Sequence, residues 1–279
     1  MTAPSFPLSS ARPIADIPAE ACRALVAIAS DIDDTISTEG KIPAVAYDAL
    51  WRARDAGLKV IPVTGRPAGW CDHIARMWPV DGVVGENGAL YFRHIAGARH
   101  GDPGRLVRHY VLDAAARAAN RTRLDAVARD VLAEVKGCAV ASDQAYREFD
   151  LAIDFCEDVP RLPDSAVDRI VAVFERHGCT AKVSSIHVNG WFGTYDKLGM
   201  VRTFLKEELG LDADARKDAV LFTGDSPNDE PMFAHFPSSV GMANIADFAS
   251  RVKNPPRYIA SKRGGEGFAE TIDVVLRKR

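Results

Sequence analysis

Three carboxylates and a threonine directly follow a run of apolar and small residues, and these residue types could do chemistry together. The run covers residues 24–30, and Asp31, Asp33, Asp34 and Thr35 come after it. Burying ionised carboxylates is costly unless a cation or another partner compensates them. Because Asp31 and Asp33 are two residues apart, an extended backbone points both side chains the same way. Beside a divalent cation, one aligned acid can attack an electrophile while the other moves a proton.

A hydroxyl, a glycine and a cation follow a second apolar run. Thr64, Gly65 and Arg66 come after residues 58–63. A threonine hydroxyl and a glycine N–H at the edge of a sheet are good donors to a phosphate oxygen. Lys197 lies where a later helix is expected to begin, and helix N-termini already favour anions. These residue types indicate a site for a phosphate group.

A second acidic cluster follows the apolar residues 219–223. It contains Asp225, Asn228 and Asp229. Mg²⁺ prefers carboxylate and water oxygens to nitrogen or sulfur. Asp225 and Asp229, together with Asp31, are therefore candidate ligands of a magnesium ion.

Each of these segments by itself also has a purely structural interpretation. The acids at residues 31–34 suit a turn or a helix cap, Thr64-Gly65 suits a turn, and Asn228-Asp229 suits the cap of a following helix. A lysine early in a helix, such as Lys197, is usually a solvated surface residue. The chemical interpretation therefore depends on all of them meeting at one place.

The elements that would bring these residues together are predicted from hydrophobic periodicity. A strand ending at Asp31, a helix over residues 43–57 and a strand over residues 58–63 form a βαβ unit with parallel strands and a right-handed crossover. Open α/β sheets bind their ligands at the carboxyl ends of such strands. We therefore expect Asp31 and Thr64 to lie at the same edge of one sheet.

The middle of the chain has a different pattern. Residues 149–155 alternate between apolar and small or polar side chains, which is typical of an antiparallel strand buried on one face only. The other elements expected there are a hairpin or long loop over 93–110, helices over 112–136 and 164–177, and a strand over 180–188. Helices on one face of a mostly antiparallel sheet make an α+β domain.

These patterns predict an N-terminal tail and two domains. The tail covers residues 1–18, the parallel-sheet domain residues 19–89 and 189–279, and the inserted α+β domain residues 90–188.

Composition excludes several classes of protein. The chain has 279 residues, of which 47% are hydrophobic and 26% charged, and its net charge of −3 gives no reason to expect a nucleic acid partner. Its five cysteines form no Cys-x-x-Cys pair, so we expect free thiols in a reducing compartment. It contains neither the G-x-G-x-x-G dinucleotide fingerprint nor a Walker A motif. With no apolar run of membrane-spanning length and no secretion signal, a cytoplasmic protein without membrane contacts is expected.

The ordered set of acid pair, Thr-Gly, lysine and acid cluster resembles the haloacid dehalogenase-like (HAD) hydrolase superfamily. Asp31-Ile-Asp33-Asp34-Thr35 matches its first motif, D-x-D-x-T, and Thr64 matches its second. Lys197 matches the third motif, and Gly224-Asp225-Ser226-Pro227-Asn228-Asp229 matches the fourth, GDSxND. The resemblance implies an α/β fold in which a Rossmann-like parallel-sheet core carries an inserted C2-type cap.

Two further segments resemble one branch of this superfamily. Thr64-Gly-Arg-Pro67 and Glu86-Asn-Gly-Ala89 look like the Cof-type and sugar-phosphatase branch, which includes sucrose, trehalose and mannosyl-phosphoglycerate phosphatases. One departure is Asp34, where many members have glycine. An additional acid there could change metal affinity.

The resemblance also implies roles for individual residues. Asp31 would attack phosphorus to form an aspartyl-phosphate, and Asp33 would protonate the leaving alkoxide and then deprotonate the hydrolytic water. The implied Mg²⁺ ligands are Asp31, the carbonyl of Asp33, Asp225 and Asp229, the last of which could instead orient Lys197. The implied groups that bind phosphate or substrate are Thr64, Gly65, Arg66, Lys197, Asn228 and His187.

Residues where the cap rejoins the core are candidates to touch the leaving group. These are His187, Asn189 and Trp191, although packing roles are favoured for His187 and Trp191 because packing is the commoner role of such residues. Arg66 could equally reach the substrate or brace its loop.

The sequence thus predicts a Mg²⁺-dependent phosphatase that hydrolyses a small phosphorylated metabolite, with a sugar phosphate as the expected class. A phosphomutase of the same fold is one alternative, and a non-catalytic phosphosugar-binding regulator is another. The expected partner is the small-molecule substrate, and the expected state is a monomer or a homodimer.

Overall fold

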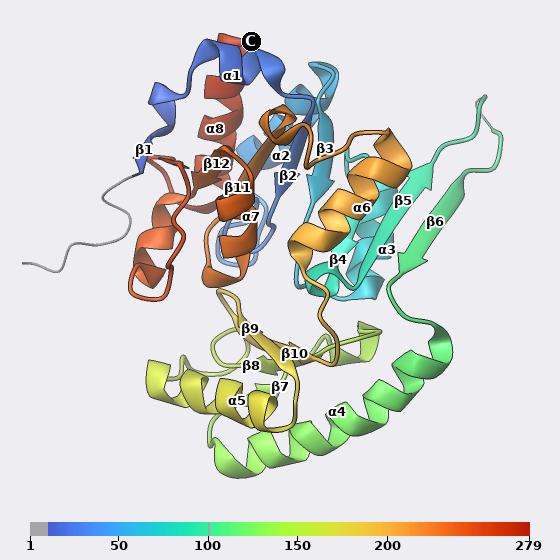
Figure 1. The fold of residues 1–279 in the computed structure, drawn as a ribbon, viewed down its shortest axis with the longest axis vertical. Coiled ribbons are helices and arrows are strands. Elements are labelled where there is room, and N and C mark those ends of the chain that lie inside the picture. Colours follow the sequence, from blue (N-terminus) through green and yellow to red (C-terminus); the bar gives the residue numbers. More distant parts are fainter. Residues whose placement is uncertain (1–10, 100) are drawn as a thin grey trace, which may run out of the picture.

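Parallel strands form the central sheet of the larger domain (Figure 1). The computed structural model describes residues 11–99 and 101–279, and within them the strand order of this sheet is β1-β13-β12-β11-β2-β3. The strands are β1 (Arg12–Pro13), β2 (Ala27–Ser30), β3 (Lys59–Pro62), β11 (Val220–Gly224), β12 (Ser238–Gly241) and β13 (Tyr258–Ile259). The expected α/β fold with a parallel-sheet core is confirmed.

Helices cover both faces of this sheet, because successive side chains of each strand point to opposite faces. Ile28 of β2 packs with one hydrophobic cluster, whereas Ala27 and Ala29 pack with the other. The first cluster includes α1 (Ala19–Ala24), α2 (Ala44–Asp55), α3 (Ala68–Met77) and α8 (Gly264–Lys278). The second includes α6 (Lys197–Leu209) and α7 (Glu230–His235).

The carboxyl ends of three neighbouring strands meet at one edge. Ser30 is the register partner of both Thr223 in β11 and Pro62 in β3. The backbone N–H of Asp31 donates to the Thr223 carbonyl (2.9 Å), and that of Val63 donates to the Ser30 carbonyl (2.7 Å). The residues that follow these strands are therefore held side by side, as the βαβ pattern predicts.

A three-stranded antiparallel sheet extends the larger domain beyond the predicted boundary at residue 89. It consists of β4 (Val83–Gly85), β5 (Leu90–Ile95) and β6 (Arg105–Tyr110). The β5–β6 hairpin lies beside α3 and α6 (Figure 1). Leu90 and Phe92 are buried with Ile74 in the first hydrophobic cluster, so burial keeps this hairpin on the parallel-sheet domain. The structure favours a boundary after Tyr110.

The inserted domain, here α4 to β10, is an antiparallel sheet with two helices on one face (Figure 1). Its sheet has the order β7-β8-β10-β9, and α4 and α5 pack on it through a cluster that includes Val131, Phe174 and Ile153. The elements are α4 (Ala114–Glu134), β7 (Ala139–Val140), β8 (Leu151–Asp154), α5 (Asp164–Arg176), β9 (Thr180–Val183) and β10 (His187–Trp191).

Two predictions for this domain were wrong in detail. The strand expected over residues 180–188 divides into β9 and β10, because residues 184–186 form a turn in which the Ser184 N–H donates to the His187 carbonyl (2.9 Å). The strand β8 is buried on both faces rather than one. Its second face, which carries Ala152 and Asp154, is also buried, and Asp154 accepts from the backbone N–H groups of residues 156–158 of the same domain.

Part of the predicted tail is folded. Arg12–Pro13 pairs with β13, and Ile14 and Ile17 are buried in the first hydrophobic cluster. The ammonium of Lys278 donates to the carbonyls of Ala15 (2.6 Å) and Ile17 (2.8 Å), which ties this segment to α8. Residues 1–10 of the predicted tail lie outside the described residues.

No helix in the described ranges is both long enough and apolar enough to cross a membrane.

Candidate active site

A buried lysine joins two of the predicted carboxylates. Lys197 Nζ lies 2.6 Å from Asp31 Oδ1 and 2.7 Å from Asp229 Oδ1. Lys197 is the first residue of α6, and the preceding Asp196 caps this helix by accepting from the Gly199 N–H (2.7 Å). The start of the helix therefore presents the ammonium at the edge of the sheet, and the surface interpretation of Lys197 was wrong.

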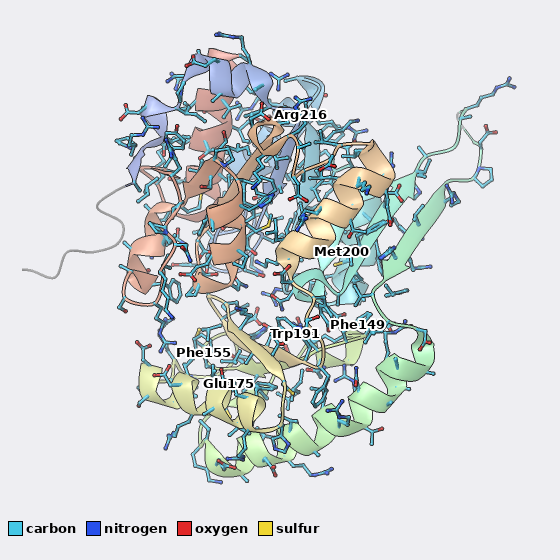
Figure 2. All side chains as sticks on the ribbon, in the orientation of Figure 1. Phe149, Phe155, Glu175, Trp191, Met200 and Arg216 are labelled. Carbon is cyan, nitrogen blue, oxygen red and sulfur yellow. The ribbon has the colours of Figure 1, made fainter. Side chains whose placement is uncertain are left out.

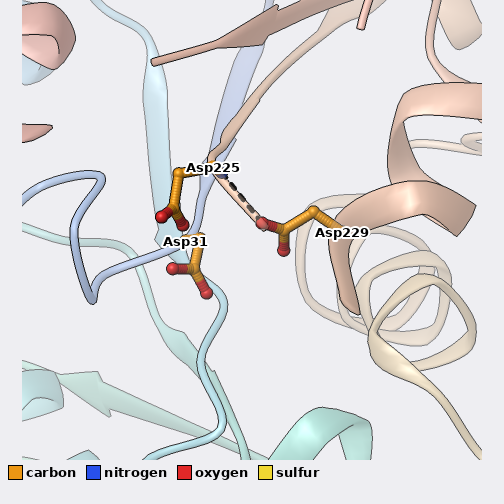
Figure 3. A group of neighbouring side chains, drawn as sticks. All are labelled: Asp31, Asp225 and Asp229. Carbon is orange, nitrogen blue, oxygen red and sulfur yellow. Dashed lines mark hydrogen bonds between the residues drawn. The ribbon is translucent and has the colours of Figure 1, made fainter. Parts of the chain in front are cut away.

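Asp31, Asp225 and Asp229 form a carboxylate cluster (Figure 3). One oxygen of each lies within 4.8 Å of the others, and all three residues are buried. Asp225 Oδ2 accepts from Asn244 Nδ2 (2.9 Å), and Oδ1 accepts from the Thr35 hydroxyl (3.3 Å). This buried group of hard oxygen donors fits Mg²⁺.

The three acids are not equally free to bind a metal. Asp229 Oδ1 accepts from Lys197, and its Oδ2 accepts from the backbone N–H groups of Asp225 (3.0 Å) and Ser226 (3.2 Å). Asp31 and Asp225 each contact fewer donors. Asp229 is therefore better placed to orient Lys197 than to contact a metal directly.

Burial and mutual repulsion shape the protonation of this cluster. Burial raises the pKa of Asp31 well above its usual range, against the opposing effect of Lys197, and Asp229 raises it further. Burial and the Asp31 charge raise the pKa of Asp225 in the same way. Burial lowers the pKa of Lys197, but Asp229 and Asp31 more than offset this and keep it charged. Three carboxylates therefore share one ammonium, and a divalent cation would relieve the repulsion that favours their protonation.

The departure from glycine at Asp34 has a backbone explanation. Asp34 has φ of +56°, in the left-handed region that glycine adopts most easily and aspartate tolerates better than most residues. Its carbonyl accepts from Asn244 Nδ2 (2.9 Å), the same amide that donates to Asp225. The sharp turn thereby fixes the segment that follows Asp33.

The predicted phosphate loop lies beside Asp31 and is held by its own residues and by the inserted domain. The Thr64 hydroxyl accepts from the Arg66 N–H (2.9 Å). A Cβ at Gly65 would lie 3.2 Å from the side chain of Asn87, so this close approach favours glycine. The Gly65 carbonyl accepts from Arg147 Nη1 (2.7 Å), and Arg147 belongs to the inserted domain.

Arg66 binds Asp33 instead of solvent. Its Nε donates to both carboxylate oxygens of Asp33 (3.0 and 3.1 Å). Its other nitrogens donate to Glu157 (2.6 and 3.2 Å) and Asp143 (3.4 Å) of the inserted domain. Burial lowers the pKa of Arg66, but Asp33 and Glu157 raise it above its usual value. The Asp33 carboxylate therefore faces Arg66 and lies outside the three-acid cluster, so only its carbonyl remains a candidate metal ligand.

Three other predicted residues from the second half of the chain line a narrow cavity. They are His187, Asn189 and Asn228, and residues 184–186, Asp31 and Asp33 line it with them. Trp191 does not line it. Trp191 is buried where the two domains meet (Figure 2) and stacks on Tyr195, with ring centroids 5.6 Å apart.

A buried polar network fastens the two domains together, and the sequence did not reveal it. Glu86 Oε1 accepts from the N–H groups of Ala68 (2.9 Å) and Glu148 (2.8 Å). Its Oε2 accepts from those of Phe149 (2.7 Å) and Asp150 (3.2 Å). In the sequence, the Glu86-Asn-Gly motif was the only feature that pointed to this segment, and it did so through the family resemblance.

The same motif also adjoins the segment that carries Lys197. Gly88 has φ of +99°, and a Cβ there would overlap the Asp196 carbonyl at the start of α6. The loop after β4 is thus packed against the turn that presents Lys197.

Comparisons with known proteins agree with this geometry. Residues 28–98 match the family of haloacid dehalogenase-like hydrolases. The chain is 30% identical over 263 residues to the phosphoglycolate phosphatase of Pyrobaculum neutrophilum, a match that covers 91% of this chain and 96% of that relative.

Two solved structures are also similar. That of a Thermoplasma acidophilum protein has a TM-score of 0.65 at 20% identity and covers 90% of this chain and 98% of its own. That of the Synechocystis sucrose-phosphatase in complex with sucrose and phosphate has a TM-score of 0.59 at 14% identity, with the same coverage of 90% and 98%. These structural similarities concern the fold.

Proposed function

The chain belongs to the haloacid dehalogenase-like hydrolases and is a phosphatase, and from this premise we propose that it uses Mg²⁺ to hydrolyse a small phosphorylated metabolite through an aspartyl-phosphate. The observation that carries the proposal is the position of Asp31. It directly follows the strand β2, contacts Lys197 at 2.6 Å and lies beside Asp225, two residues before a second acid. A nucleophile, a phosphate-binding cation, a metal site and a proton carrier are thereby combined at one sheet edge.

The first step is attack by a carboxylate oxygen of Asp31 on phosphorus. As the P–O bond to the leaving group breaks, Lys197, the Thr64 hydroxyl and the Gly65 N–H stabilise the charge on the remaining phosphoryl oxygens. A Mg²⁺ ion bound by Asp31, the Asp33 carbonyl and Asp225 would offset the repulsion between the nucleophile and the phosphate.

Asp33 is the proposed proton carrier. It protonates the leaving alkoxide and then removes a proton from the water that hydrolyses the aspartyl-phosphate. Both of its oxygens accept from Arg66 in this structure. The proposal therefore requires Arg66 to move aside before the Asp33 carboxyl can reach the leaving alkoxide.

The inserted domain is proposed to act as a mobile cap. The cavity between residues 184–187 and Asp31 has a volume of about 10 Å³, which is room for about one water molecule. A phosphomonoester can enter only if this loop moves away, and its return would exclude water from the site.

For the substrate, we propose a sugar phosphate or a related small phosphomonoester. Relatives bear the names phosphoglycolate phosphatase and sucrose-phosphatase, so both carboxylated and hydroxylated leaving groups are candidates.

The test is phosphate release from p-nitrophenyl phosphate and a panel of sugar phosphates, with Mg²⁺ or with EDTA. Asp31→Asn is compared with Asp55→Asn, which changes an exposed acid at the end of α2. We expect Mg²⁺-dependent turnover that Asp31→Asn abolishes and Asp55→Asn retains. Binding of sugar phosphates without phosphate release, in the native protein and in Asp31→Asn alike, would refute the proposal.

A further inference from the structure

The phosphate loop, Thr64 to Arg66, is held at both ends by the parallel-sheet domain. The Thr64 N–H donates to a carbonyl of β4 (2.9 Å), and the Thr64 carbonyl accepts from the Asn87 N–H (3.1 Å). At the other end, the Arg66 carbonyl accepts from the Glu86 N–H (3.1 Å). Since buried backbone groups are normally paired, the partners of the groups that remain show what else the loop depends on.

Two donors of this loop have no acceptor among the described residues. They are the Gly65 N–H and the proton of the Thr64 hydroxyl. Gly65 lines the narrow cavity beside Asp31. The Thr64 hydroxyl oxygen already accepts from the Arg66 N–H (2.9 Å), so its own proton is left to donate elsewhere. These are the two donors that the proposed function assigns to the phosphoryl oxygens.

The direction of the Thr64 hydroxyl depends on one peptide group, the peptide between Gly65 and Arg66. The N–H of this peptide is the one that the hydroxyl accepts, and its carbonyl is that of Gly65. Glycine rotates more freely about its backbone bonds than other residues do. A rotation of this peptide would take its N–H away from Thr64, so the group that holds the Gly65 carbonyl also orients the hydroxyl.

Arg147 of the inserted domain holds that carbonyl. Its Nη1 donates to the Gly65 carbonyl at 2.7 Å. The Arg147 side chain is fully buried, and its nitrogens also donate to Asp143 (3.0 and 3.1 Å) and Asp150 (3.0 and 3.2 Å). Because the guanidinium is planar and rigid, the two acids fix the direction in which Nη1 points.

We propose that Arg147 is a positioning residue for phosphoryl transfer, which fixes the peptide after Gly65 and thereby aims the Thr64 hydroxyl at the phosphoryl group. The inference rests on the proposed function of Thr64. It follows that the phosphate loop has its full set of contacts only while the inserted domain is docked on the parallel-sheet domain.

The test is a double-mutant cycle, because Arg147 could instead act only by stabilising the fold. For the native protein, Thr64→Val, Arg147→Lys and the double variant, kcat/KM is measured with p-nitrophenyl phosphate and Mg²⁺. Arg147→Lys keeps the positive charge beside Asp143 and Asp150, but a single ammonium cannot serve both acids and the Gly65 carbonyl at once. Arg176→Lys is the matched control, because Arg176 pairs with Glu134 on the exposed surface of the same domain.

We expect Thr64→Val to lower kcat/KM by about a hundredfold, because it removes a donor to the phosphoryl oxygens. Arg147→Lys should lower kcat/KM of the native protein by about tenfold, because the remaining donor is misdirected. In the Thr64→Val background the same substitution should cost less than about threefold, because the hydroxyl that it orients is gone. Arg176→Lys should change neither background. A loss of folded enzyme would lower both backgrounds by the same factor and cannot produce this difference.

Equal factors for Arg147→Lys in the two backgrounds would overturn the inference, as would an Arg147→Lys variant or a Thr64→Val variant as active as the native protein. Asp31→Asn separates this failure from failure of the proposed function. If the native protein hydrolyses the ester and Asp31→Asn does not, such results refute only the role of Arg147. No hydrolysis by the native protein refutes the proposed function and this inference with it.

Discussion

Replacing Arg147 by methionine would test how much its buried ion pairs beside the domain junction stabilise the protein. The Arg147 side chain is fully buried and donates to both oxygens of Asp150 (3.0 and 3.2 Å), to Asp143 (3.0 and 3.1 Å) and to the Gly65 carbonyl (2.7 Å). Methionine has a flexible, unbranched side chain that can fill much of the same space. Arg147→Met therefore removes the charge and the donors with little change in packing.

The expected loss follows from what remains after the substitution. Removing one partner of a buried ion pair costs about 3–5 kcal/mol, because the other charge is left uncompensated. Here two buried acids lose a cation, but Asp150 keeps the Asn189 amide (2.9 Å) and Asp143 keeps a longer contact with Arg66 (3.4 Å). We expect Arg147→Met to lower the free energy of unfolding by about 4 kcal/mol.

Urea unfolding followed by far-UV circular dichroism measures this loss. Arg176→Met is the control, because Arg176 pairs with Glu134 on the exposed surface of the inserted domain, where ion pairs contribute little. A loss below about 1 kcal/mol for Arg147→Met would refute the reasoning. The charge argument also predicts that adding Asp143→Asn and Asp150→Asn to Arg147→Met recovers at least half of the lost stability. A triple variant as unstable as the single one would show that charge is not the cause.

Three further predictions concern single residues of the site and the junction. Lys197→Met should lower kcat/KM for p-nitrophenyl phosphate by at least about a hundredfold, because the ammonium both contacts Asp31 and stabilises phosphoryl oxygens; a decrease below tenfold would contradict its role. Burial and Asp150 raise the pKa of Glu86 from 4.5 to about 7, so the folded state holds this proton more tightly than the unfolded state. Its stabilising contribution is therefore complete below pH 4.5, is lost as the pH rises to about 7 and amounts to on the order of 3 kcal/mol. Urea unfolding between pH 4.5 and 8 should accordingly show a steeper decline for the native protein than for Glu86→Gln, and parallel curves would contradict the assignment. Asp34→Gly should leave stability nearly unchanged, whereas Asp34→Ala should lower it by about 1 kcal/mol, because φ of +56° strains alanine; equal unfolding midpoints for the two variants would refute this.

The sheet edge was predictable because its order depends on local patterns. Apolar runs marked β2, β3 and β11, and the crossover rule made them parallel, so their carboxyl ends had to coincide. Asp31, Thr64 and Asp225 follow these strands and lie together in the structure. Their order along the chain also supported the family resemblance, which the comparisons confirm.

Some elements were misplaced because burial by distant segments is not visible in a local pattern. The β5–β6 hairpin belongs with the parallel-sheet domain because Leu90 and Phe92 find apolar partners in α3. Both faces of β8 are buried, which the alternating pattern of its residues did not predict. Similarly, the sequence pattern assigned Ile14 and Ile17 to a tail, but in the structure both are buried in the first hydrophobic cluster.

The sequence by itself determined which side chains meet at the sheet edge, because strand periodicity and chain handedness fix where consecutive parallel strands end. Only the tertiary structure decided what surrounds them. Arg66 and Glu157 are 91 positions apart, yet they lie 2.6 Å from one another. Ion pairs of this kind depend on how one domain packs on the other, and long-range packing leaves no period in the sequence. The acids that surround Arg66 could be recognised only once the two domains were seen together.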